Sequence, residues 1–449
     1  MYRRIVLFGA TGDLTARLLM PAFAQLASEG RLPDDLTILG TSTKDITADA
    51  FRAHITSALA EHAAGIPAEA RASVVDRLDY RLGDVTDAAS VKDLLGPTRG
   101  GQLVYLALPS VILERALAAL SEAGLGTEDA LAVEKPFGTD LASAQRLNGI
   151  LAQKMPQPTV FRIDHFLTDT LVQRVLALRF MNRLFEPLLN AHHVARVDVS
   201  WLESLALEGR AGYYDRAGAL KDMLQNHLMV AMSLVAMDEP ARIDGASFRG
   251  ARVEVLRSIP TPTPEQIGYH TVRARYGAGT IGERAVPAYV DEPGVDPSRN
   301  TETYAAVRLN LRNNRWDGVP FVLRSGKALA EDRAEIAIHL KPVVAPFEHV
   351  VSPNVLRIGL MEPYVRVGTV INGDDLAPLR QELDLMSPPS PRSAYANLIL
   401  EMLEGHASLF IRGDEAEEAW RIVDPIVAAW RDGVVPLHTY AAGEAPPAL

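Results

Sequence analysis

The sequence predicts an α/β domain with a parallel sheet, followed by an α+β domain with a large, mainly antiparallel sheet. The chain has 449 residues, which is too long for one hydrophobic core and indicates two domains. Over roughly the first third of the chain, short apolar runs alternate with helical patterns, as in a parallel sheet with crossover helices. The pattern then changes to an alternation with period two, which favours antiparallel strands with one covered face.

Each domain is predicted from its own series of elements. The apolar runs predicted as parallel strands lie at residues 3–8, 36–41, 103–108, 131–135 and 158–163. Helical patterns separate these runs, and the first of them, at residues 13–30, ends at Gly30. The alternating runs of the second domain lie at residues 193–203, 303–311, 320–326, 334–341 and 364–371. Amphipathic helices are predicted at residues 393–405 and 414–430. We therefore predict two domains, residues 1–164 and residues 165–449.

Composition and charge exclude several classes of function. The net charge of −11 argues against nonspecific binding to nucleic acid or to an anionic membrane surface. The chain has no cysteine, which excludes disulfides, thiolate nucleophiles and zinc held by cysteine, and which fits a reducing cytoplasm. The first apolar run is too short for a signal peptide or a membrane span. We expect a cytoplasmic protein whose partner is a small molecule.

A loop with two glycines follows the first predicted strand and opens the first helix. Its residues are Gly9, Ala10, Thr11, Gly12, Asp13 and Leu14. Glycines at such a point let the backbone approach a pyrophosphate, which then lies at the helix N-terminus. Taken alone, this short motif is also typical of an ordinary strand-to-helix turn. The strand–turn–helix context, and the later apolar run that ends at Leu108 and Pro109, favour a dinucleotide site in a Rossmann-type domain.

The end of the second predicted strand bears on which dinucleotide is bound. A carboxylate at this point binds the ribose 2′-hydroxyl of NAD, whereas a cation favours the 2′-phosphate of NADP. The residues here are Thr43, Lys44 and Asp45, and by themselves they indicate neither cofactor.

The segment FRIDHFLTDT, at residues 161–170, lies at the predicted domain boundary. Asp164 and His165 follow a strand-like run, and Asp169 lies four residues after His165. An adjacent carboxylate and imidazole suit proton transfer, and ligand sites are common between domains. We predict that this segment belongs to an active site.

Eight motifs, in order along nearly the whole chain, resemble the glucose-6-phosphate dehydrogenase family. They are GATGDL (9–14), YLALP (105–109), AVEKPFG (132–138), RIDHFL (162–167), LRFMNRLFEPL (178–188), GRAGYYDRAGALKDMLQNHL (209–228), VPFVLRSGKAL (319–329) and LFIRGDEAEEAWRIVDPI (409–426). The resemblance implies a Rossmann-type domain followed by an α+β domain. It also implies oxidation of the C1 hydroxyl of a pyranose to a lactone, with hydride transfer to NAD or NADP. No metal is expected, and the resemblance implies a homodimer or homotetramer.

The resemblance also implies roles for residues at matching positions. His227 matches the general base that takes the proton from the C1 hydroxyl, and Asp164 matches its carboxylate partner. Lys135, which precedes Pro136, matches a residue between the substrate and the nicotinamide. The matches to residues that hydrogen-bond sugar hydroxyls are Glu203, Asp222 and Lys327. This assignment is chemically reasonable, because hydride leaves C1 easily only when the hydroxyl proton is removed, and an imidazole held by a carboxylate suits that task.

Several positions depart from the family pattern where it binds the sugar 6-phosphate. The family motif RIDHYLGK reads RIDHFLTD here, so His165 is kept while Phe166 and Asp169 replace a tyrosine and a lysine. Asp332 stands five residues after Lys327, where the family has an arginine or lysine. Two further departures are Leu18, at a family lysine, and Met361, at a family glutamine.

These departures predict a substrate without a phosphate. Two unit charges about 5 Å apart interact by roughly 3 kcal/mol at an effective dielectric of ~20, and each ~1.4 kcal/mol changes an affinity tenfold. Asp169 and Asp332 are therefore expected to repel a phosphate, to accept a hydroxyl, or to pair with the ammonium of an amino sugar. The alternative is that Arg333, beside Asp332, or Arg174 binds a phosphate instead.

Three functions follow from these observations. The first is an NAD(P)-dependent 1-dehydrogenase of a non-phosphorylated or amino sugar, and the second is an authentic glucose-6-phosphate 1-dehydrogenase. The third is a catalytically silent relative that senses a sugar or binds a partner, which the presence of Asp164, His227 and Lys135 disfavours. The family's 2′-phosphate-binding arginine falls at Thr43, with Lys44 adjacent, so we expect NAD to be used, alone or alongside NADP.

Overall fold

The apolar runs of the N-terminal part form one parallel sheet of six strands, in the order β3-β2-β1-β4-β5-β6. The strands are β1 (Arg4–Phe8), β2 (Thr37–Ser42), β3 (Leu78–Leu82), β4 (Leu103–Leu106), β5 (Ala130–Glu134) and β6 (Val160–Ile163). Five of them were predicted from the sequence. The strand β3 was not, because this edge strand buries only Leu78 and Tyr80 and lacks a continuous apolar run. The α/β class with a parallel sheet is confirmed.

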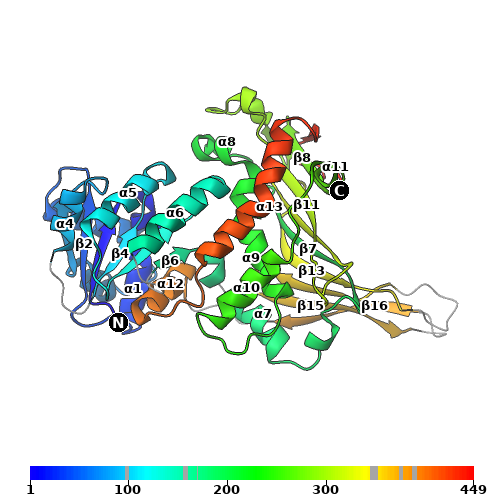
Figure 1. Ribbon diagram of the computed structural model, residues 1–449, viewed down its shortest axis with the longest axis horizontal. Coiled ribbons are helices and arrows are strands. Elements are labelled where there is room, and N and C mark those ends of the chain that lie inside the picture. The colour runs from blue at the N-terminus through cyan, green and yellow to red at the C-terminus, as the bar shows by residue number, and fades with distance from the viewer. Residues whose placement is uncertain (97–100, 155–159, 169, 344–351, 374–377, 387–391) are drawn as a thin grey trace. The chain divides into compact units, whose positions relative to one another are not determined.

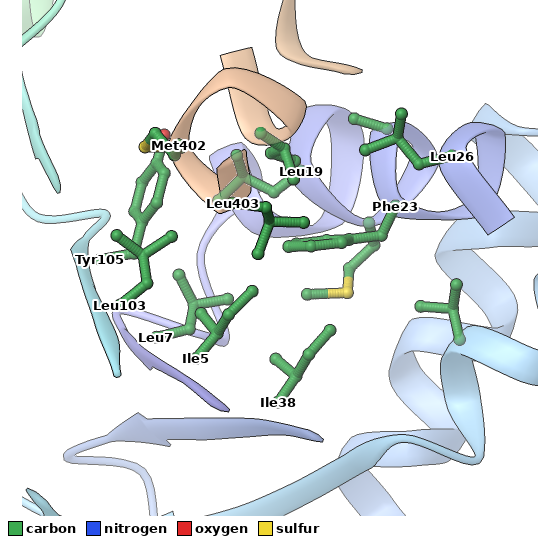
Figure 2. Packing of buried hydrophobic residues seen from close by; sticks show 14 of the residues in the cluster. Ile5, Leu7, Leu19, Phe23, Leu26, Ile38, Leu103, Tyr105, Met402 and Leu403 are labelled. Carbon is green, nitrogen blue, oxygen red and sulfur yellow. The ribbon is translucent and has the colours of Figure 1, made fainter. Parts of the chain in front are cut away.

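Helices cover both faces of this sheet, each above its own apolar cluster. One face packs against α1 (Met20–Ser28), α2 (Ala48–His62), α3 (Ala68–Val75) and α12 (Ala394–Glu404). The other face packs against α4 (Ala88–Leu95), α5 (Ser110–Ala123) and α6 (Leu141–Lys154). Figure 2 shows Leu403 of α12 close to Leu19, and Met402 of the same helix close to Tyr105 of β4. A helix from late in the chain therefore completes the core of the N-terminal sheet.

The chain, described by a computed structural model, divides into two units (Figure 1). The structure describes residues 1–96, 101–154, 160–168, 170–343, 352–373, 378–386 and 392–449. The first unit holds Met1–Asp169, Ala241–Arg249 and Ser390–Glu417, and the second holds Thr170–Pro240, Gly250–Pro389 and Glu418–Leu449. The predicted boundary between residues 164 and 165 lies close to the end of the first of these segments. The later segments of the first unit were not predicted, because an amphipathic helix such as α12 does not indicate which core it covers.

The second unit is built on a nine-stranded sheet, in the order β16-β15-β14-β13-β7-β12-β11-β8-β17. The strands are β7 (Val194–Leu202), β8 (Thr271–Gly277), β11 (Tyr304–Asn310), β12 (Pro320–Gly326), β13 (Arg333–Leu340), β14 (Val355–Gly359), β15 (Tyr364–Asn372), β16 (Pro378–Met386) and β17 (Leu437–Ala441). The pairs β12–β7 and β17–β8 are parallel and the other pairs are antiparallel, so the predicted mainly antiparallel sheet is confirmed. A separate hairpin joins β9 (Gly279–Ile281) to β10 (Arg284–Val286).

Helical segments of the second unit pack on this sheet, either directly or against one another. They include α7 (Thr170–Phe180), α8 (Ala211–Ala219), the π-helical segment η4 (Leu220–Leu228), α9 (Met229–Ala236) and α11 (Pro264–His270), of which α8, η4 and α11 contact the sheet directly. Two further helices, α10 (Ser247–Arg257) and α13 (Gly413–Arg431), have their first residues in the first unit and the rest in the second. The segment η4 packs against β7, β11 and β12. Among the described helices, none has the length and apolar character needed to cross a bilayer.

Candidate active site

The glycine loop lies where the strand order of the first sheet reverses. β1 pairs with β2 on one side and with β4 on the other, and open parallel sheets bind ligands at the carboxyl ends of such strands. Gly9 has φ +81°, and a Cβ built on it would lie 2.1 Å from the carbonyl oxygen of Ala107. Gly9 and Ala10 donate backbone hydrogen bonds to the carbonyl of Thr41, at the end of β2. This close approach of backbone segments fits a site for a pyrophosphate, as the sequence predicts.

We expect a Gly9→Ala substitution to destabilise the first unit and to weaken cofactor binding. The new methyl group would force the loop away from Ala107, and the left-handed φ adds strain of about 1 kcal/mol or more. Gly30→Ala is the matched control, since Gly30 also has a positive φ of 64°, but a Cβ added there would have nothing within 4 Å. Urea unfolding and the KM for NAD and NADP measure the effect. Equal changes in both variants would contradict the role given to the contact with Ala107.

The carboxyl end of β2 carries the residues predicted to distinguish the two cofactors. Thr43 and Lys44 are exposed, which leaves them accessible to a ligand. Ser42 is held by the hydroxyl groups of Thr11, at 3.2 Å, and of Tyr80, at 2.9 Å. The backbone N–H of Lys44 donates to the Ser42 hydroxyl at 3.2 Å. Hydrogen bonds thus connect the glycine loop to the end of β2. Lys44 is an exposed cation at this point.

Lys135 and Asp164 follow the neighbouring parallel strands β5 and β6, so they come to the same edge of the first sheet. Asp164 is 2% exposed and accepts a hydrogen bond of 3.0 Å from the backbone N–H of Phe166. The Lys135–Pro136 peptide bond is cis. His165 begins the short helical segment η2 (His165–Thr168), and its ring stacks on that of Tyr395 with 6.2 Å between centroids. The structure thus brings three residues of the predicted site together within the first unit. Leu108 and Pro109 follow the end of the neighbouring strand β4, Leu106, at the same edge.

A further carboxylate, Glu134, lies beside Lys135 and was not predicted as part of the site. The hydroxyl of Tyr105 donates a 2.5 Å hydrogen bond to Glu134, and Tyr395 of α12 donates another. Burial raises the pKa of Glu134 to about 7, although both tyrosines and Lys135 oppose the shift, and nearby Asp164 adds to it. The motif AVEKPFG contains this glutamate, but a strand-end glutamate ordinarily indicates solvent exposure, so the sequence carried no signal for it.

We expect a Glu134→Gln substitution to remove part of the pH dependence of stability. The folded state holds the Glu134 proton more tightly than the unfolded chain, so the free energy of unfolding falls as pH rises from the ordinary carboxyl range through about 7. For a shift of this size the fall is about 3 kcal/mol at most, because one pKa unit corresponds to ~1.4 kcal/mol. Urea unfolding between about pH 5 and about pH 8 gives the free energy of unfolding of the wild type and of the variant. In the difference between the two, the contributions of all other titrating groups cancel. Parallel curves would contradict the raised pKa.

The sugar-binding residues predicted in the second unit form one connected group. Lys327, which is 8% exposed, pairs with Glu203 at 2.7 Å. Its ammonium lies over the ring of Tyr214, 5.6 Å from the centroid. Burial raises the pKa of Tyr214, and Asp222 adds to the shift, so this carboxylate lies near the same ring. Asp222 also accepts a hydrogen bond from Tyr213. The sequence named three of these residues, but the two tyrosines of the GYYD motif were missed.

His227 lies on η4 together with Asp222. The two residues are five positions apart, and in a π-helix residues five apart are joined by one turn, so they lie on the same side of η4. Wide helical turns of this kind often occur at functional sites. His227 is 2% exposed. The predicted pairing of His227 with Asp164 joins residues of different units, and it stays a prediction.

The residues predicted to exclude a phosphate have varied surroundings. Asp169 lies outside the described residues. Asp332 accepts hydrogen bonds from the backbone N–H and the hydroxyl of Ser204, at 2.6 Å and 3.0 Å. This carboxylate therefore has a structural partner, which weakens the argument that it faces a substrate.

The alternative phosphate-binding cations also have contacts inside the second unit. Arg333 pairs with Glu331, and Arg174 donates to the carbonyl of Glu362 at 3.2 Å. Leu18 and Met361, at the other two departures, are exposed.

The fold and these side chains define an oxidoreductase with a Rossmann-type dinucleotide-binding domain. The family model "Glucose-6-phosphate dehydrogenase, NAD binding domain" matches residues 6–174, and "Glucose-6-phosphate dehydrogenase, C-terminal domain" matches residues 176–449. The chain belongs to the glucose-6-phosphate dehydrogenase family.

Relatives and solved structures agree with this assignment. The glucose-6-phosphate 1-dehydrogenases of Zymomonas mobilis and of Mycolicibacterium smegmatis are each 37% identical over 98% of this chain, covering 94% and 93% of their own length. A glucose-6-phosphate dehydrogenase solved in complex with glucose-6-phosphate has a TM-score of 0.89 and 27% identity, covering 99% of this chain and 96% of that one. The enzyme from Mycobacterium avium has a TM-score of 0.86 and 30% identity, covering 100% of this chain and 96% of its own.

Proposed function

We propose that the chain is a glucose-6-phosphate 1-dehydrogenase that oxidises C1 of the sugar and reduces NADP or NAD. The observation that carries the proposal is the group formed by Lys327, Glu203, Tyr214 and Asp222, set on the same unit as His227. A group with several donors and acceptors suits a sugar ring, whose hydroxyls need both. Relatives that match nearly the whole chain carry this activity in their names.

The reaction needs a base at the C1 hydroxyl and an acceptor for hydride. When bound, the nicotinamide cofactor supplies the acceptor, and the loop at Gly9, which excludes a Cβ, suits its pyrophosphate. We propose that His227 takes the hydroxyl proton. Asp164 orients the imidazole and stabilises its charged form. Lys135 holds the substrate near the nicotinamide through its ammonium.

The structure weakens the prediction of a substrate without phosphate. Of the two carboxylates in that argument, Asp332 is hydrogen-bonded by Ser204. The prediction then depends mainly on Asp169 and on the loss of the tyrosine hydroxyl at Phe166. His165 is retained, and an imidazole can donate to a phosphate oxygen. We therefore favour glucose 6-phosphate over a neutral or amino sugar as the substrate.

A non-phosphorylated or amino sugar is the second candidate substrate, because Asp169 stands where the family has a phosphate-binding lysine. An ammonium on the sugar would pair with this carboxylate, whereas a phosphate would be repelled. The catalytic steps are the same in both cases. The two candidates therefore differ only in the end of the substrate remote from C1.

The cofactor is proposed to be NADP as well as NAD. Lys44 is an exposed cation two residues after the end of β2, where it can attract the 2′-phosphate of NADP. The side chain of Thr43 can hydrogen-bond the same ribose. A single flexible lysine gives weaker discrimination than a bidentate arginine, so we expect both cofactors to be used.

Initial rates with purified protein test the proposal. Glucose 6-phosphate, glucose and glucosamine are each offered with NAD and with NADP, and the formation of the reduced cofactor is followed by absorbance. We expect kcat/KM for glucose 6-phosphate to exceed that for glucose by at least about 100-fold, which corresponds to ~2.7 kcal/mol of phosphate binding. A higher kcat/KM for glucose or glucosamine would instead establish the second candidate.

A further inference from the structure

A cavity in the second unit, separate from the proposed sugar-binding group, is lined by five cations and two carboxylates, together with polar and apolar residues. It has a volume of about 590 Å³. The residues that line it come from the middle of α8 and the start of η4, from the segment 298–302, from β8 and from the end of α13. Its cations are Arg216, Lys221, Arg273, Arg299 and Arg431. This concentration of positive charge contrasts with the net charge of −11 of the whole chain.

The two carboxylates at this cavity are already engaged in the wall. Asp215 is buried, accepts a 2.8 Å hydrogen bond from the hydroxyl of Tyr289, and pairs with Arg299. Glu302 is buried and accepts a 3.1 Å hydrogen bond from the backbone N–H of Leu220. Burial raises the pKa of Glu302 to about 7, so this carboxyl group is only partly charged near neutral pH. Arg299 therefore pairs with Asp215, and Arg431 pairs with Asp432 at 3.3 Å. Arg216, Lys221 and Arg273 remain against Glu302 alone, so an excess of positive charge is left at the cavity.

Arg216, Lys221 and Arg273 keep donors available for a ligand. Among the described residues, no carboxylate lies within ion-pair distance of Arg216 or Lys221. Arg273 uses its Nε to donate to the carbonyl of Val435 at 3.0 Å and lies 6.0 Å from the centroid of Trp430. Several cations around one cavity destabilise the folded protein unless an anion neutralises them, because like charges repel.

We propose that this cavity binds a small molecule with two or more phosphate groups. The volume falls in the range of about 300–1,000 Å³ that is usual for small-molecule sites. Several separated cations match several phosphates better than a single one, since each phosphate needs its own charge-assisted donors. Lys221 lies in the first turn of η4. The same helical segment carries Asp222 and, near its other end, His227. A ligand held there therefore contacts the helix that bears the proposed base.

Calorimetric titration of the full-length protein with sodium tripolyphosphate tests the site. The test variant combines Arg216→Gln with Lys221→Gln. The control variant combines Lys92→Gln with Arg183→Gln, which removes the same charge from two exposed positions outside the cavity. We expect wild type and control to bind with the same Kd, and the test variant to bind at least about tenfold more weakly. The measurement uses no turnover, so its outcome is independent of the proposed enzymatic function.

Several outcomes would overturn the proposal. They are equal Kd values in the test variant and the wild type, equal losses in the test and control variants, and no binding by the wild type at millimolar tripolyphosphate. Inorganic phosphate is titrated alongside, and it should bind more weakly, because it reaches fewer of the cations. If the double variant unfolds, Arg431→Gln replaces it, since this exposed side chain lies at the edge of the same cavity.

Discussion

Replacing His227 with asparagine is expected to lower kcat by about 100-fold to 10,000-fold, the usual contribution of a general base. Asparagine keeps the approximate size and a hydrogen-bonding group but cannot take up a proton. The KM for the sugar should change much less, because binding depends mainly on Lys327, Glu203 and Asp222. Steady-state kinetics with glucose 6-phosphate and NADP provide both constants.

A second histidine in the same unit supplies the control for this experiment. His192 is exposed and is absent from the eight family motifs, so His192→Asn should leave kcat within a factor of about two. The fold of both variants is checked by thermal unfolding. A His227→Asn enzyme with nearly full kcat would show that another group takes the proton. A large rise in KM at constant kcat would instead identify His227 as a binding residue.

The substitution Lys327→Gln is expected to raise the KM for the sugar by about 10-fold to 100-fold. It removes the ammonium that pairs with Glu203 at 2.7 Å and lies over Tyr214, and it leaves a partly buried carboxylate without this partner. Loss of one member of a buried pair costs up to about 3–5 kcal/mol in fully buried cases. Part of that cost will appear as a lower free energy of unfolding. Because Glu203 is partly exposed, we expect this loss of stability to be smaller than the value for a fully buried pair.

Companion variants separate the effect on sugar binding from the effect on folding. Lys327→Arg keeps the charge, and it should recover part of the affinity lost in Lys327→Gln. Adding Glu203→Gln to Lys327→Gln removes the uncompensated carboxylate, so the double variant should regain stability without regaining a low KM. Equal KM values in Lys327→Gln and the wild type would contradict the place of Lys327 in the sugar site.

The strands were predictable from the sequence where burial of both faces gives a continuous run of apolar residues. Strands such as β1 and β4 are covered on both faces, so they appear as continuous apolar runs. The strand β3 exposes three of its five residues and was missed. Assignment of α12 to the first unit was also missed, because its partners, such as Leu19, lie hundreds of residues away. A helical pattern indicates an apolar face but not the surface that this face covers.

The candidate site was predictable where its residues lie within short motifs at the ends of strands. The loop at Gly9 and the residues at the ends of β5 and β6 lie at one edge of a sheet, as parallel strands require. The role of Glu134 depends on hydrogen bonds from Tyr105 and from Tyr395 of a distant helix, so the motif AVEKPFG, although it contains this glutamate, does not reveal that role. Asp332 looked like a substrate-facing carboxylate because the sequence does not reveal its hydrogen bonds with Ser204.

The central claim is that hydride passes from C1 of glucose 6-phosphate to the cofactor. The most direct test is a reaction with glucose 6-phosphate deuterated at C1 and with NADP, followed by mass spectrometry of both products. The account predicts one deuterium in the reduced cofactor, a 6-phosphogluconolactone or its hydrolysis product without that deuterium, and a slower rate than with the unlabelled sugar. Reduced cofactor without deuterium, or deuterium retained in the sugar product, would contradict it.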